Sequence, residues 1–403
     1  MGVSGGYQDT DFGNFPEDWD IVPVGDLFTF KNGLNKAKEF FGHGTSIVNY
    51  MDVYNHPALR VRMVEGKVDV TSKEQQSYEV LKGDVFFTRT SETVEEIGTA
   101  AVMLDDTQST VFSGFVLRAR PSDDALVDEF KAYCFRPRYF RDQVTSRASY
   151  TTRALTNGKS LSATMLAKPS RSEQHAIAEA LGDVYALLDG LDRLIAKKRD
   201  LKTGTMQQLL TGKKRLVGFN GEWEECELGE LLDYEQPTKY LVSSTEYSEQ
   251  YNIPVLTAGK SFLLGMTNET HGIYANVPVI IFDDFTTASK YVDFPFKAKS
   301  SAMKMLAKKR KIDNLRILYE IMRTAEFIKS GHKRYWIAEY QRVKVGVPSP
   351  SEQAALAQVL SDMESEINFL EAKRKKSYRL KQAMMQELLT GKTRLPFKEA
   401  AND

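Results

Sequence analysis

The feature that most constrains the fold is an internal repeat. Residues 172–216 align without a gap to residues 351–395, and about 20 of the 45 positions are identical. Both copies begin with Ser-Glu-Gln and end with Leu-Leu-Thr-Gly-Lys-x-Arg-Leu. A fainter repeat precedes each copy, where Trp19 and Trp223 are each followed six residues later by a glycine. The chain therefore consists of two related halves, and its fold should contain two copies of one segment.

The repeated segments are predicted to form long amphipathic helices. Apolar side chains recur in alternating steps of three and four residues, which is the spacing of a heptad stripe on one helix face. About 30 residues at 1.5 Å each predict a helix of about 45 Å. The stripe comprises Ile177, Leu181, Val184, Leu188, Leu191 and Ile195 in the first copy, and Leu356, Leu360, Met363, Ile367 and Leu370 in the second.

The ends of each repeat fit helix caps. A proline precedes both copies, and Ser172 and Ser351 are the predicted N-caps. Gly212 and Gly391 follow the helices, where glycine suits a left-handed C-cap. Each stripe could pack on its own domain. We favour the alternative, in which the two helices pack on each other as an antiparallel coiled coil that holds two globular domains apart, because matched heptads of this length need no globular neighbour.

The regions between the repeats are predicted to be two α+β domains. Residues 82–91 and 276–287 are strand patterns, whereas residues 124–137 and 314–327 have the spacing of amphipathic helices. A length of 403 residues allows two or three domains with their own cores. The predicted order is a flexible N-terminus (1–14), a first domain (15–171), a helical spacer (172–216), a second domain (217–350), a second helical spacer (351–395) and a tail (396–403).

Composition narrows the function classes. The formal net charge is zero at pH 7, so no global field favours a nucleic acid or a membrane, although a local basic face can exist within a neutral total. The N-terminus lacks the basic and apolar regions of a signal peptide, and no apolar run approaches about 18 residues. These features predict a cytoplasmic protein with no membrane partner.

Basic charge is concentrated in a few stretches. Residues 143–171 and 294–312 contain several lysines and arginines and no acidic residue, and residues 330–336 mix cations with aromatic residues. Such stretches suit phosphate contacts, and interspersed Ser, Thr and Asn can contact base edges. A solvated charged face is the alternative for any single stretch. The predicted DNA contacts are Lys31, Asn32, Asn35, Lys36, Arg89, Thr90, Ser91, Arg147, Thr151, Thr152, Arg153, Asn157 and Lys159 in the first domain, and Thr257, Lys260, Ser261, Lys297, Lys299, Ser300, Ser301, Lys304, His332, Lys333 and Arg334 in the second.

Catalytic motifs are not evident in the sequence. The Gly-Lys-Thr triplet at 391–393 is typical of the end of a P-loop, but Gln386 stands where the first glycine of that loop is needed, and Lys214 replaces the hydroxyl residue in the other copy. Asp283 and Asp284 could bind a metal or accept a hydrogen bond from cytosine N4, whereas a strand-end turn or a local ion pair is the simpler explanation. We therefore expect no catalytic residue, no metal and no cofactor on this chain.

The duplicated helices between two variable domains resemble the specificity subunits of type I restriction-modification enzymes. The resemblance covers nearly the whole chain and rests on the repeated Ser-Glu-Gln and Leu-Leu-Thr-Gly-Lys motifs and on the Trp openings. Residues 253–274 and 279–306 are similar to one class of target recognition domain in that family, and residues 30–42 are similar to another.

The resemblance implies a division of labour. Each domain would be a target recognition domain that grips one half of a split, asymmetric double-stranded DNA site through the major groove, and the helices would set the gap between the halves. Two methylation subunits, which methylate adenine with adenosylmethionine, would dock on the repeated helices. Restriction subunits, which use ATP and magnesium, would join through them. Two rival hypotheses remain: a stand-alone endonuclease with a metal at Asp283 and Asp284, and a coiled-coil adaptor that binds no DNA.

Overall fold

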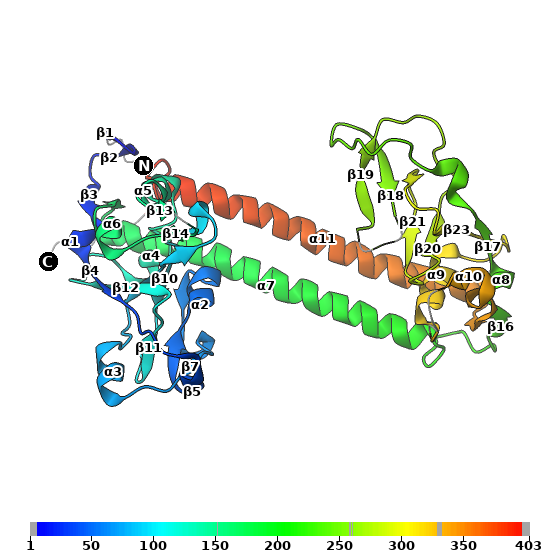
Figure 1. Ribbon diagram of the computed structural model, residues 1–403, viewed down its shortest axis with the longest axis horizontal. Helices are drawn as coiled ribbons and strands as arrows, with labels where there is room; N and C mark the ends of the chain where they lie inside the picture. Colours follow the sequence, from blue (N-terminus) through cyan, green and yellow to red (C-terminus); the bar gives the residue numbers. More distant parts are fainter. Residues whose placement is uncertain (1–5, 151, 258, 260, 329–332, 397–403) are drawn as a thin grey trace. The chain divides into compact units, whose positions relative to one another are not determined.

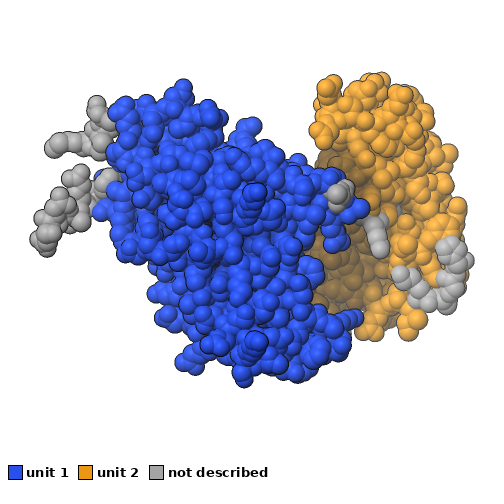
Figure 2. All heavy atoms as spheres, turned by 60° about the vertical axis from the view of Figure 1, so that its left-hand side comes forward, with its two compact units in different colours: residues 1–192, 373–403 blue, residues 193–372 orange. Residues whose placement is uncertain are grey.

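The computed structural model describes residues 6–150, 152–257, 259, 261–328 and 333–396. The chain forms two compact units, which Figure 2 colours separately. The first unit comprises Met1–Asp192 and Lys373–Asp403, and the second comprises Arg193–Ala372. Two long helices, α7 (Arg171–Leu210) and α11 (Pro350–Leu388), each contribute residues to both units (Figure 1).

The long helices confirm the predicted helical repeats but exceed the predicted length. They contain 40 and 39 residues, or about 60 Å each instead of about 45 Å. The predicted caps at Ser172 and Ser351 are wrong, because both helices begin earlier. The hydroxyl of Ser170 accepts from the Glu173 amide at 3.3 Å, and that of Ser349 accepts from the Glu352 amide at 3.4 Å. Both predicted C-cap glycines are left-handed, with φ values of 69° and 68°.

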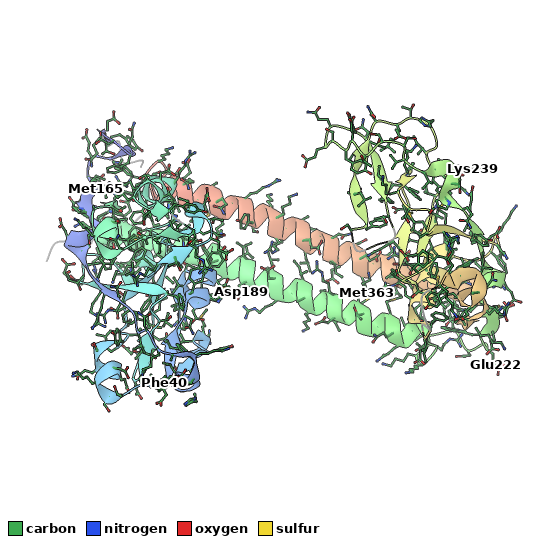
Figure 3. The ribbon with its side chains drawn as sticks, viewed as in Figure 1. Phe40, Met165, Asp189, Glu222, Lys239 and Met363 are labelled. Carbon is green, nitrogen blue, oxygen red and sulfur yellow. The ribbon has the colours of Figure 1, made fainter. Side chains whose placement is uncertain are left out.

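Helices α7 and α11 pack together antiparallel, as predicted. In the first unit, Arg374 Nη2 donates to Asp192 Oδ2 at 3.1 Å. In the second unit, ion pairs join Lys198 to Glu366 and Lys202 to Glu364 at 2.6 and 2.7 Å. The partner number on α11 falls as the number on α7 rises, which defines the antiparallel direction. Figure 3 labels Asp189 on α7 and Met363 on α11.

The apolar stripe packs on the helix's own domain in one part of each helix and on the other long helix in another part. Every predicted stripe residue is buried except Met363, which is half-buried. Ile177 and Leu181 belong to the core of the first domain, and Leu356 and Leu360 belong to the core of the second. The start of each helix therefore packs on its own domain, and the remaining stripe is buried along the helix pair.

The first domain contains a five-stranded sheet with the order β4-β12-β8-β10-β6. These strands are Phe28–Asn32, Val116–Pro121, Val85–Thr88, Ala100–Met103 and Ala58–Leu59. A three-stranded sheet has the order β11-β5-β7, with Thr110–Phe112, Phe41–Val48 and Lys67–Val68. Another joins β13, β14 and β9, with Ser149–Tyr150, Ala154–Leu155 and Thr90–Ser91. Two pairs are β1 with β2 (Tyr7–Thr10, Gly13–Pro16) and β15 with β3 (Met165–Lys168, Asp20–Pro23).

Short helices cover the first domain. They are α1 (Val24–Leu27), α2 (Tyr50–Asn55), α3 (Ser72–Ser77), α4 (Asp128–Lys131), α5 (Arg138–Ser146) and α6 (Gly158–Ser162). The predicted helix over residues 124–137 is therefore mostly wrong, because α4 is a single turn. The chain continues in tight turns, in which the amides of Tyr133 and Arg136 donate to carbonyls three residues earlier.

The second domain repeats the core of the first. Its four-stranded sheet has the order β17-β23-β20-β21, with Leu232–Glu235, Met303–Lys308, Val279–Asp283 and Ser289–Val292. A second sheet has the order β19-β18-β22, with Leu263–Thr267, Ile253–Leu256 and Lys297–Ala298. β16 pairs with β24 (Glu224–Glu227, Lys344–Val347), and the helices are α8 (Leu228–Leu231), α9 (Leu315–Thr324) and α10 (Tyr335–Ala338). The predicted α+β class is confirmed, as is the helix within residues 314–327.

The repeated motifs meet in one buried cluster in each unit. In the first unit, Glu173 is 1% exposed and accepts from Trp19 Nε1 at 3.0 Å and from Arg394 at 2.6 and 2.8 Å. In the second unit, Glu352 accepts from Trp223 Nε1 at 3.1 Å and from Nε and Nη2 of Arg215, each at 2.6 Å. The end of each long helix is thus tied to the start of the other and to the Trp opening of a domain.

Helical hydropathy does not indicate a membrane segment. Within the residues that the structure describes, no helix combines the length and the apolar character that crossing a bilayer requires.

Candidate nucleic-acid interface

One edge of the first domain's main sheet collects several predicted contacts. Strands β4 and β8 end at this edge and β12 begins there, because Asn32 pairs with Leu117 and Thr88 pairs with Val116. Asn32 is exposed, and Arg89 follows β8 directly and is half-buried. We call this the recognition edge of the first domain.

A small sheet brings the basic stretch 147–157 to the same edge. Strand β14 pairs with β9, so Ala154 lies opposite Ser91 and Leu155 opposite Thr90. The amide of Thr156 donates to the carbonyl of Arg89 at 3.0 Å. Arg153 is exposed and lies 3.9 Å from Glu92. Residues distant in sequence, at 89–91 and 152–157, therefore form one surface, as a composite DNA contact requires.

A hollow beside this edge contains residues that the sequence did not indicate. Its volume is about 380 Å³, and its lining includes Met51, Tyr54, Phe115 and Arg153. Met51 is 55% exposed and Phe115 is 61% exposed, so both present apolar surface to this hollow. Periodicity could not identify Phe115, because a phenylalanine next to the apolar run of β12 is usually a core residue.

Some of the other predicted contacts of the first domain bind neighbouring residues of the chain, and others are exposed. Lys31 donates to the Ser77 carbonyl at 2.6 Å, and Lys36 is paired with Glu74 at 2.8 Å. That ion pair lowers the pKa of Glu74 to about 2. Asn157 caps α6 by accepting from the Ser160 amide, and Ser91 is buried. Asn35, Arg147, Thr152 and Lys159 are exposed, whereas Thr151 lies outside the described residues.

The second domain has an equivalent recognition edge. Strands β17 and β20 end where β23 begins, since Glu235 pairs with Met305 and Asp283 pairs with Met303. The amide of Tyr335 donates to the carbonyl of Asp284 at 2.8 Å, which brings residues 333–336 to this edge. Arg334 is exposed, with its guanidinium carbon 6.0 Å from the centre of the Phe285 ring. Lys333 pairs with Glu339.

The smaller sheet of the second domain presents further predicted contacts. Strands β18 and β22 are parallel, and Leu256 lies opposite Ala298. Thr257 and Lys299 follow these strands directly, so they leave the sheet at the same edge. Lys299, Ser261 and Ser301 are exposed, and Thr257 and Ser300 are half-buried. Lys260 and His332 lie outside the described residues.

Two predicted contacts of the second domain point inward. Lys297 is 0% exposed and pairs with Glu269 at 2.7 Å, and Lys304 is 1% exposed and pairs with Asp284 at 3.1 Å. The ion pair with Lys297 lowers the pKa of Glu269 to about 2. Neither lysine is therefore exposed for a direct DNA contact in this structure. The stretch 294–312 crosses two strands, where alternate side chains face the interior.

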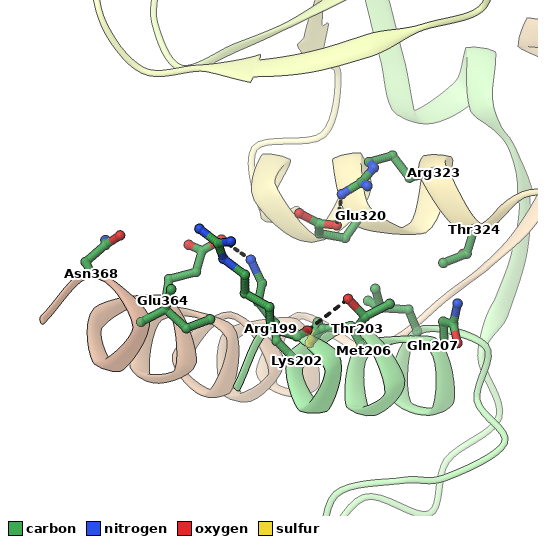
Figure 4. A pocket seen from close by; sticks show the side chains of 12 residues that line it. Arg199, Lys202, Thr203, Met206, Gln207, Glu320, Arg323, Thr324, Glu364 and Asn368 are labelled. Carbon is green, nitrogen blue, oxygen red and sulfur yellow. Dashed lines mark hydrogen bonds and ion pairs between the residues drawn. The ribbon is translucent and has the colours of Figure 1, made fainter. Parts of the chain in front are cut away.

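A polar pocket in the second unit lies among α7, α9 and α11. Its volume is about 600 Å³ (Figure 4). Glu364 accepts from Lys202 at 2.7 Å and from Arg316 at 2.5 Å, and Arg323 donates to Glu320 at 3.0 Å. Glu364 on α11 thus joins α7, through Lys202, and α9, through Arg316, whereas the pair of Glu320 and Arg323 lies within α9. The pocket is thus lined by cations and carboxylates that largely neutralise one another.

Comparison with known proteins places both halves of the chain in one family. The family described as type I restriction modification DNA specificity domain matches residues 16–197 and 220–377. The chain belongs to this family. It is a DNA specificity subunit of a type I restriction-modification system, as the resemblance in its repeated motifs implied.

Individual relatives cover different parts of this specificity subunit. The specificity subunit of the Escherichia coli enzymes EcoR124I and EcoR124II is 53% identical over 152 residues, which is 36% of this chain and 37% of that protein. A putative specificity subunit of Methanocaldococcus jannaschii, that of MjaX, is 23% identical over 433 residues, covering 96% of this chain and 97% of that protein. The crystal structure of a type I S subunit from M. genitalium has a TM-score of 0.56 at 14% identity, and covers 95% of this chain and 97% of that one. The similarity to the M. genitalium structure supports the assignment of the fold.

As a specificity subunit, the chain is the non-catalytic part of its complex. Asp283 Oδ1 accepts from the amides of Phe285 and Thr286 at 2.9 and 2.8 Å, and Asp284 pairs with Lys304. The simpler explanation of this aspartate pair, a turn and a local ion pair, is therefore confirmed. Within the described part of the chain, no cluster of three or more His, Cys, Asp or Glu side chains is arranged to hold a metal ion.

Proposed function

We propose that this specificity subunit reads a bipartite, asymmetric site in double-stranded DNA, with one half-site bound by each recognition edge. The observation that carries the proposal is the repetition of one edge in two domains of different sequence. Each edge combines the ends of two main-sheet strands with a basic loop that is hydrogen-bonded to the second strand end, through Thr156 in one domain and Tyr335 in the other. The predicted domain boundaries, 15–171 and 217–350, belong to this proposal.

The exposed side chains suit two kinds of DNA contact. Arg153 and Arg334 can contact phosphates or guanine edges, and Lys299 can contact a phosphate. Asn32 can accept from and donate to adenine. The exposed ring of Phe115 suits the methyl group of thymine, which lies in the major groove. Phosphate contacts would position the duplex, and the amide and apolar contacts would discriminate between bases.

The same proposal assigns the partners of the complex. Two methylation subunits would dock along the repeated helices, and restriction subunits would join through them. Leu194 and Leu201 on α7 are 38% and 48% exposed and lie seven residues apart, so they share one face of the helix. A hollow of about 730 Å³ is lined by Leu201 and by other residues of α7 between Arg193 and Gln208. Adenosylmethionine, ATP and magnesium would act on the partner subunits.

Single alanine substitutions at the two edges test the assignment of half-sites. Arg153→Ala should relax one half-site and Arg334→Ala the other, each with a loss of about 1–3 kcal/mol in discrimination if the arginine reads a base. The assembled complex would be titrated with duplexes in which one half-site at a time is altered. Lys82→Ala is the matched control, because Lys82 is exposed and precedes β8 at the opposite end from the recognition edge. Equal effects of both arginine variants on the same half-site would contradict the proposal.

A further inference from the structure

A buried ion pair lies directly behind the recognition edge of the second domain. Asp284 and Lys304 are 0% and 1% exposed, and their Oδ2 and Nζ atoms are 3.1 Å apart. Lys304 Nζ also donates to Gln236 Oε1 at 3.1 Å and lies 5.6 Å from the centre of the Tyr234 ring. The ammonium group of Lys304 thus binds both Gln236, which follows β17, and Asp284, which follows β20.

Asp284 connects three segments of the edge. Its amide donates to the Ala302 carbonyl at 3.1 Å, just before β23. Its carbonyl accepts from the Tyr335 amide at 2.8 Å, and its Oδ1 accepts from the buried Trp336 amide at 2.9 Å. The segment that carries Lys333 and Arg334 is therefore fixed through both the backbone and the side chain of one aspartate.

The first domain shows that the sheet itself does not require this charge pair. Strand registers place Arg89 at the position of Asp284, Leu117 at that of Lys304 and Asn32 at that of Gln236. The backbone bonds are repeated there, since Arg89 donates to the Phe115 carbonyl at 3.1 Å and accepts from the Thr156 amide at 3.0 Å. Leu117 carries no charge at the position of Lys304, so the buried ion pair has no counterpart in the first domain.

Stability alone is a weak reason for such a pair. Desolvating two charges costs about as much as their attraction returns, so an apolar pair of similar volume often stabilises a fold equally well. The charges add a defined orientation of the two side chains. A charge-assisted bond fixes the orientation of each partner more narrowly than apolar packing does.

We propose that Asp284 and Lys304 are positioning residues for base readout by the second domain. They hold Gln236 and residues 333–336 in the orientation in which the exposed side chains of this edge contact the half-site. This inference rests on the proposed function of the edge. It replaces a direct contact by Lys304 with an indirect role.

The salt dependence of DNA binding separates the two roles. A lysine that neutralises a phosphate contributes about 0.9 to the slope of log K against log salt concentration, whereas a buried positioning lysine contributes none. We would compare Lys304→Met with the exposed neighbour Lys299→Met in the assembled complex. The double variant Asp284→Asn with Lys304→Gln keeps a hydrogen-bonded pair without a buried unpaired charge, and it decides the question if Lys304→Met does not fold.

The expected results differ between the variants. Lys304→Met and the double variant should lower discrimination at the second half-site by about tenfold or more, with the first half-site and the salt slope unchanged. Lys299→Met should lower the slope by about 0.9 with the recognised sequence unchanged. A lower slope for Lys304→Met, or unchanged discrimination in the double variant, would overturn the inference. If the wild-type complex recognised no bipartite site, the proposed function itself would be refuted instead.

Discussion

Deleting residues 192–198 and 368–374 together should shorten the gap between the two half-sites by about three base pairs. Seven helical residues span about 10 Å, and one base pair rises by about 3.4 Å. Deleting a whole heptad from each helix keeps the apolar stripe in phase, and the two segments lie opposite each other in the antiparallel pair, as Asp192 and Arg374 show. The preferred gap would be measured by selection from a library of sites with every gap length.

The same variant should bind the original site at least about 100-fold more weakly. One domain would lose register with its half-site, and each lost base contact costs about 1–3 kcal/mol. Ala372→Gln is the length-preserving control, because Ala372 is exposed within the deleted part of α11. A deletion variant that assembles and keeps the original gap would show that the helices do not act as the spacer.

Arg394→Ala should lower the free energy of unfolding by about 3 kcal/mol. Arg394 donates to both oxygens of Glu173 and to both oxygens of Asp18, at distances from 2.6 to 2.9 Å. These hydrogen bonds raise the pKa of the Arg394 guanidinium. Without them, the buried carboxylate of Glu173 keeps its hydrogen bond from Trp19 but loses its positively charged partner, and removing one partner of a buried ion pair typically costs about 3–5 kcal/mol. Urea denaturation followed by circular dichroism measures the change.

Two neighbouring substitutions make that experiment specific. Lys392→Ala removes one positive charge from an exposed position in the same loop, and should change stability by less than about 0.5 kcal/mol. Arg394→Lys should fall between the other two variants, because an ammonium group cannot reproduce the bidentate geometry. Equal losses for Lys392→Ala and Arg394→Ala would mean that the cluster does not tie the chain end to the first domain.

The repeat made the helical part of the fold predictable. Heptad spacing identified the stripe from Ile177 to Ile195, and the two glycines identified where the helices end. The starts were misplaced because Ser170 and Ser172 are equally good cap residues in sequence, and only the hydrogen bond from Glu173 distinguishes them. The role of Arg394 was also missed, since it depends on a glutamate 221 residues away.

The recognition edges were only partly predictable. Local composition located the basic stretches, but strand register decides which of their side chains face outward. Lys299 and Lys304 belong to the same stretch, yet one is exposed and the other is buried against Asp284. Phe115 has the composition of a core residue and is 61% exposed. The common strand order of the two main sheets could not be predicted, because the sequences of the two domains show little alignment.

Sequencing the methylated adenines in cells that contain this complete complex shows whether the chain specifies a bipartite DNA site. We expect methylation at one asymmetric motif made of two specified parts and an unspecified gap of fixed length, and this methylation should disappear when the chain is deleted. Replacing residues 15–171 with another recognition domain should change one part of the motif only. A contiguous motif, or methylation that is independent of this chain, would contradict the account.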